Sequence, residues 1–158
     1  MYIEKYWENY IGGTDDSLTL LDYLAGKQKK EISFEEIFTD AGLDKLCSFQ
    51  KTDVELSVPV DGFEAEIHYA IDLLTDLAAL MLECKVNGSV NLSELCDLYE
   101  EDSIVSITAT PKEQKLMNKV LKDFAESPLS YDLCEMVPEE DMMEMAAICE
   151  ELRRELYE

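Results

Sequence analysis

The sequence predicts an α+β fold, a single domain over residues 1–158 in which several helices cover a small antiparallel sheet built on a central hairpin. Two observations support this prediction. Apolar and polar residues alternate from residue 53 to residue 70, as is typical of half-buried strands. Apolar residues recur at helical spacing in the segments before and after this stretch. A chain of 158 residues suits one such domain, because it can bury roughly two thirds of its unfolded surface.

The N-terminal third is predicted to be helical. Residues 2–11 carry apolar side chains on one helical face, and two glycines end the pattern. The run from Thr14 to Ser17 offers several N-cap residues for a second helix that ends at Gly26. Ser33 and Glu36 have the spacing of a capping box, which indicates a short third helix.

The central hairpin is the most specific local signal. Asp61-Gly62 is a two-residue loop of the kind that forms a type I′ turn, in which glycine accepts a positive φ. This loop sets the register of the two strands. The expected cross-strand pairs are Val60–Phe63, Val58–Ala65, Leu56–Ile67 and Val54–Tyr69. One face of the hairpin is therefore apolar and has to be covered, whereas the other carries Glu55, Glu64 and Glu66.

The segment from Ile71 to Cys84 is the most hydrophobic predicted helix. Asp72, Asp76 and Glu83 leave only a narrow polar stripe, so we expect this helix to be central. Its apolar face and the hairpin should form one contiguous core. The predicted core residues are Val54, Leu56, Val58, Val60, Phe63, Ile67, Tyr69, Leu74, Leu77 and Met81.

The C-terminal half is predicted to add strands and two long helices. Alternation over residues 104–109 indicates a third strand, and residues 90–92 are a candidate fourth, followed by a short helix over 93–99. Thr110 and Glu113 form a capping-box pattern at the start of one helix. Acidic residues after Pro138 favour the N-terminus of the last helix through its dipole.

The charge of the chain limits its partners. Thirty-six acidic residues against thirteen basic ones give a net charge of −23. Such a balance argues against binding to nucleic acid, whose recognition requires basic side chains on phosphates, and against anionic membranes. It favours a basic protein partner, because opposite charge accelerates encounter. The alternative is that the acids serve only solubility.

Cysteine usage and the absence of targeting segments predict a cytoplasmic protein. The five cysteines form no CxxC pair, and their odd number and irregular spacing indicate reduced thiols. The N-terminus lacks a basic and apolar signal-peptide pattern, and no apolar run reaches membrane-spanning length.

The sequence shows no motif for catalysis, a metal or a cofactor, so none is expected. The single histidine, His68, is predicted to face outward beside Glu66 and opposite Glu55. Such a group has the chemistry of a general acid/base or of a weak metal site. It is equally the composition of an ordinary cross-strand pair, and no nucleophile or further ligand cluster accompanies it.

The acidic side of the hairpin is the predicted recognition surface. Like charges on paired strands repel each other, so strands usually mix signs on one face. An acidic loop after residue 99 extends the predicted surface. The predicted partner-binding residues are Glu55, Glu64, Glu66, Glu100, Glu101 and Asp102.

The N-terminal runs from Tyr6 to Tyr10 and from Asp15 to Leu24 resemble openings of the small acidic immunity proteins that bacteria make against polymorphic or contact-dependent toxins. Size, acidity and the missing catalytic motif fit the same resemblance. It implies inhibition of a toxin by tight stoichiometric binding, with acidic side chains in the toxin's substrate site. Many such toxins are nucleases, whose basic clefts suit an acidic blocker. The alternatives are an acidic secretion chaperone or adaptor for an effector, and a small enzyme that uses His68 with carboxylates.

Overall fold

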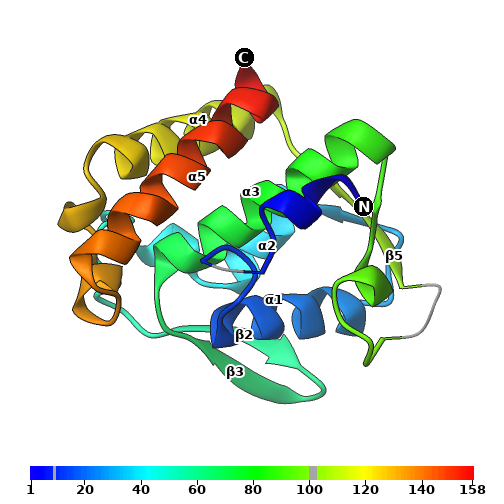
Figure 1. Cartoon of the computed structure of the whole chain (residues 1–158). Helices are drawn as coiled ribbons and strands as arrows, with labels where there is room; N and C mark the ends of the chain where they lie inside the picture. The colour runs from blue at the N-terminus through cyan, green and yellow to red at the C-terminus, as the bar shows by residue number, and fades with distance from the viewer. Residues whose placement is uncertain (9, 100–102) are drawn as a thin grey trace.

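The computed structural model describes residues 1–8, 10–99 and 103–158, and these ranges contain five α-helices and five short strands (Figure 1). The α-helices are α1 (Asp15–Gly26), α2 (Phe34–Asp40), α3 (Ala70–Asn87), α4 (Pro111–Glu126) and α5 (Glu139–Tyr157). The strands are β1 (Glu31–Ser33), β2 (Leu56–Val60), β3 (Phe63–Ile67), β4 (Val90–Asn91) and β5 (Ile104–Thr108). Short 3-10 helices are η1 (Tyr2–Lys5), η2 (Leu43–Lys45), η3 (Leu92–Glu94), η4 (Pro128–Ser130) and η5 (Asp132–Glu135). The predicted α+β class is confirmed.

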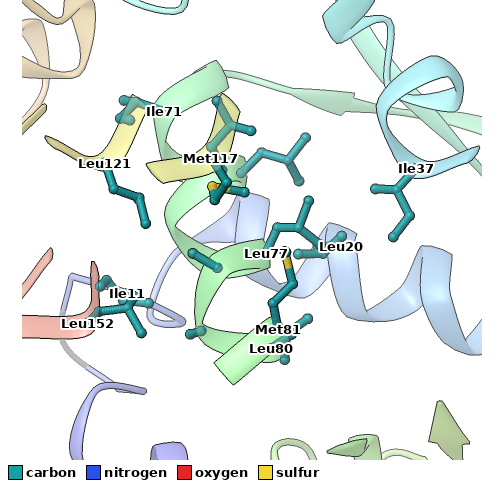
Figure 2. Close-up of a cluster of buried hydrophobic side chains, with 14 of the residues drawn as sticks. Ile11, Leu20, Ile37, Ile71, Leu77, Leu80, Met81, Met117, Leu121 and Leu152 are labelled. Carbon is teal, nitrogen blue, oxygen red and sulfur yellow. The ribbon is translucent and has the colours of Figure 1, made fainter. Parts of the chain in front are cut away.

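Helix α3 lies at the centre, as its hydrophobicity predicts. Figure 2 shows Leu20 of α1 and Ile37 of α2 on one side of α3, and Leu121 of α4 and Leu152 of α5 on the other. Leu77 of α3 is completely buried among them. The helices before and after the hairpin therefore share one hydrophobic core, in which α3 is covered on both sides.

The hairpin forms with the predicted turn and register. Asp61 and Gly62 have φ values of 49° and 82°, as a type I′ turn requires. Three of the four predicted pairs are present, from Val60–Phe63 to Leu56–Ile67. The fourth pair, Val54–Tyr69, is wrong, because β2 begins only at Leu56 and Tyr69 already serves as the N-cap of α3.

The predicted core residues of the hairpin are buried at its base and exposed at its tip. Helix α1 packs against both strands near their base, where Leu56, Val58 and Ile67 are almost inaccessible. Val60 and Tyr69 are partly buried. Phe63 at the tip is 78% exposed and Val54 is 37% exposed, so the prediction that these two belong to the core is wrong. The three core residues predicted on α3, Leu74, Leu77 and Met81, are buried.

The remaining strands form a second sheet instead of extending the hairpin. Their order is β1-β5-β4, with β1 parallel to β5 and β4 antiparallel to it. The expectation of one antiparallel sheet built on the hairpin is therefore wrong in arrangement. The three-residue strand β1 buries Ile32 alone, and a segment this short shows no alternation from which a strand can be inferred.

The N-terminal segment is not the predicted helix over residues 2–11. A 3-10 turn covers Tyr2–Lys5, and Trp7 then pairs with Ile11 through an isolated bridge. Gly12 follows with a φ of +83°, and a Cβ at this position would overlap the Trp7 ring. Gly12 therefore adopts a left-handed conformation against the Trp7 ring, and a right-handed helix cannot continue through it.

The C-terminal elements follow the prediction closely. Thr110 and Glu113 form both hydrogen bonds of the capping box that opens α4. Helix α5 begins directly after Pro138, and β4 and β5 match the two predicted strands. The predicted helix over 93–99 is reduced to the 3-10 turn η3.

Candidate functional site

The outer face of the hairpin is one candidate site. Glu64 and Glu66 are exposed on β3, and Glu55 is exposed just before β2. The Ser57 hydroxyl donates a 2.8 Å hydrogen bond to the Glu64 carboxylate. Within the described ranges, no lysine or arginine forms an ion pair with any of these three glutamates. Glu55, Glu64 and Glu66 are thus exposed on the hairpin without a lysine or arginine partner among the described residues, and we call this surface the acidic hairpin face.

The other predicted binding residues cannot be assigned to this surface. Glu100, Glu101 and Asp102 lie outside the described residues. Phe63, which was predicted to be buried, is instead an apolar side chain exposed beside the acidic hairpin face. Figure 1 shows the hairpin at the lower edge of the molecule, away from α4 and α5.

His68 does not lie in the predicted cross-strand pair with Glu55. Pairing ends at Ile67, and the His68 backbone N–H donates to the Asp16 carboxylate at 3.0 Å. The ring Nδ1 lies 2.8 Å from Asp16 Oδ1, and this hydrogen bond raises the pKa of His68. The predicted neighbour Glu66 lies 3.9 Å from Nε2. In the described part of the chain no hydroxyl or thiol hydrogen-bonds to the ring, so no side-chain nucleophile is paired with this histidine there.

Asp76 belongs to a group of buried carboxylates that sequence reasoning missed. It is fully buried on α3 and accepts hydrogen bonds from the Gly12 N–H at 2.8 Å and the Ser17 hydroxyl at 2.6 Å. Burial is the main cause of a raised pKa, and the nearby charge of Asp72 raises it further. These bonds compensate part of the cost of removing the carboxylate from water.

Asp72, one turn before Asp76, is buried without equivalent partners. Its side chain is 3% exposed, and its Oδ1 atom accepts no hydrogen bond from the residues that the structure describes. Burial raises the pKa of Asp72 to about 7, and the Asp16 charge contributes. The sequence contained a sign of this burial. Two carboxylates four residues apart lie on the same side of a helix, and the apolar residues around them indicate that this side is also covered.

The fold and this surface define the chain as an acidic α+β protein. The particular family follows from a family model, Immunity protein 68, which matches residues 2–156. Because the match covers almost the whole chain, the protein belongs to the Immunity protein 68 family. The resemblance to immunity proteins is thereby confirmed, and membership implies a toxin as partner.

The other comparisons add no relative, since no curated protein and no solved structure matches the chain. In the three described ranges, no helix has the length and apolar character needed to span a membrane.

Proposed function

We propose that this immunity protein neutralises a basic toxin domain by stoichiometric binding, and that the acidic hairpin face forms part of the contact surface. The toxin class that suits this surface best is a nuclease, because a cleft that binds phosphates is lined by basic side chains. The protein inhibits the toxin by binding alone and catalyses no reaction itself. Its cysteines, free throughout the described ranges, suit the reducing cytoplasm, where we place it.

The observation that carries the proposal is that, among the described residues, no lysine or arginine pairs with the exposed glutamates of the hairpin, and the nearest basic group is the His68 ring, 3.9 Å from Glu66. In a chain with a net charge of −23, adjacent carboxylates destabilise the folded state by repulsion. A cationic cleft relieves this repulsion on binding and accelerates encounter. The paired strands and the tight turn hold Glu64 and Glu66 in fixed positions, which lowers the ordering cost of binding.

Reversal of two charges tests the surface. The toxin is first captured from native cells with the tagged protein, and association and dissociation rates are measured at low and physiological salt. The double variant Glu64→Lys/Glu66→Lys should associate roughly tenfold more slowly at low salt, with a weaker salt dependence. The experiment also tests stoichiometry, because one equivalent of the wild-type protein should abolish the toxin's activity.

A matched control separates local from total charge. Glu126→Lys/Glu151→Lys makes the same charge change at two exposed positions, one on α4 and one on α5. Figure 1 shows both helices away from the hairpin. This variant should retain most of the wild-type association rate. Equal slowing by both pairs would mean that only net charge matters, and unchanged rates in the hairpin variant would remove the acidic hairpin face from the interface.

A further inference from the structure

A pocket of about 400 Å³ opens at the base of the hairpin, next to the acidic hairpin face. Its acidic side is formed by Asp16 of α1 and Asp72 of α3, with His68 between the hairpin and α3. Its apolar side is formed by Leu133, Met136 and Val137, which lie in η5 and in the turn before α5. Glu66 lies 3.9 Å from the His68 ring, so the pocket adjoins the proposed contact surface.

The two aspartates of this pocket differ in how their charge is satisfied. Asp16 accepts the backbone N–H groups of His68 and Tyr69 and the His68 ring bond. Asp72 is only 3% exposed, and among the described residues its Oδ1 has no donor. A buried carboxylate oxygen without a donor costs free energy that a bound cation would recover.

We propose that this pocket receives an arginine or lysine side chain of the toxin, with the cationic head group beside Asp72 and the aliphatic stem against Leu133 and Val137. This inference rests on the proposed function, because it assumes that the toxin covers the base of the hairpin. Long basic side chains combine an apolar stem with a charged end, which matches the two sides of the pocket. The exposed Met136 at the pocket provides an adaptable apolar contact for such a stem.

The electrostatics of Asp72 agree with this occupant. Burial raises the pKa of Asp72 to about 7, and a cation bound beside the carboxylate would favour its ionised form. Asp16 is already compensated by His68, which leaves Asp72 as the carboxylate available to the ligand.

The pocket is tested without the toxin. N-acetyl-arginine amide and N-acetyl-lysine amide are titrated into the full chain, with N-acetyl-glutamine amide as the uncharged probe, and the backbone amide NMR signals of His68, Tyr69 and Val137 are followed. At least one basic probe should cause saturable shifts at these residues, and the glutamine probe should not. If neither basic probe causes saturable shifts, or if the glutamine probe binds equally well, the inference is overturned.

Three variants assign the binding to Asp72. Asp72→Asn removes the charge and preserves the shape, and Val137→Phe fills the apolar side while leaving the charge intact. Each should weaken the basic probe roughly tenfold or more, whereas Asp44→Asn, at an exposed position outside the pocket, should not. The Val137→Phe result decides the question if Asp72→Asn disturbs folding, and undiminished binding in Val137→Phe overturns the proposed position.

The captured toxin provides the final measurement. Asp72→Asn should raise the Kd of the complex roughly tenfold or more, and Asp44→Asn should leave it unchanged. An unchanged Kd in Asp72→Asn would show that no toxin side chain occupies the pocket, even when the acidic hairpin face is confirmed. Failure of the charge-reversal experiment leaves the probe titrations unaffected, so the two proposals are judged separately.

Discussion

The hairpin and helix α3 both combine apolar and acidic residues but place their acids in opposite environments. Glu64 and Glu66 alternate with apolar residues on β3 and are exposed. Asp72, Asp76 and Glu83 form the polar stripe of α3 and are buried. The difference lies in what covers each element, because α3 is packed on both sides and the outer face of the hairpin is not.

The buried acids of α3 hold the N-terminal segment in place. Asp76 accepts the Gly12 N–H and the Ser17 hydroxyl, and Glu83 accepts the Ile3 N–H at 3.1 Å. All three donors lie in the first seventeen residues of the chain. Acids therefore have two roles in this molecule, since Asp76 and Glu83 hold the N-terminal segment on α3 and those on the hairpin are exposed to solvent.

The two regions should differ most in how much stability is lost when an apolar side chain is truncated. Leu77→Ala should lower the free energy of unfolding by about 2–5 kcal/mol, because it leaves a cavity in a completely buried site. Phe63→Ala removes a larger side chain at the exposed tip and should change stability by less than about 0.5 kcal/mol. Urea denaturation of both variants measures the contrast. Comparable losses would mean that the hairpin tip is part of the core.

A pH titration of stability sharpens the comparison between the acids. The pKa of Asp72 is about 7 in the folded chain and about 3.9 when unfolded, so the folded state binds its proton more tightly. Its contribution to stability is present below about pH 4 and is lost as the pH rises to 7. Asp72→Asn cannot titrate, so the stability of this variant minus that of the wild type should rise by on the order of 2–4 kcal/mol between pH 4 and pH 8.

The charge of Asp72 also raises the pKa of the neighbouring Asp76, so the difference between the two proteins reports both carboxylates together. Glu64→Gln on the exposed hairpin provides the control and should differ from wild type by less than about 0.5 kcal/mol throughout. A difference for Asp72→Asn that stays constant with pH would show that Asp72 is ionised and solvated in the folded chain.

The smallest effect is expected from truncating single glutamates. Glu83→Ala leaves the buried Ile3 N–H without an acceptor and should cost about 1–3 kcal/mol. Glu66→Ala removes an exposed carboxylate and should cost less than about 0.5 kcal/mol. Thermal denaturation of the two variants is the measurement. An equal, small loss in both would contradict the role of Glu83 in holding the N-terminal segment.

The parts of the fold that could be predicted are those determined by neighbouring residues. The turn at Asp61-Gly62 and the cap at Thr110 depend on local backbone chemistry, and both formed as expected. The hydrophobicity of the segment around Leu77 correctly indicated a central helix. The predicted helix over residues 2–11 did not form, because Gly12 lies against the Trp7 ring and donates its N–H to Asp76, 64 residues away, which no local pattern reveals.

The candidate site was predicted in part for the same reason. Strand alternation placed Glu64 and Glu66 on one exposed face. Burial of Asp72 and the pairing of His68 with Asp16 depend on segments 52 or more residues apart in the sequence, which no local pattern reveals. The exposure of Phe63 likewise depends on tertiary packing, because α1 contacts both strands and yet leaves this side chain at the tip uncovered.

The bonds between the N-terminal segment and α3 also impose an order on folding during synthesis. The acceptor of the Gly12 N–H lies 64 residues further along the chain, and that of the Ile3 N–H lies 80 residues further. At the ribosome the first residues therefore emerge long before their acceptors and wait without them, at a translation rate of about 5–20 residues per second. The N-terminal segment can therefore reach its final conformation only after α3 has been synthesised.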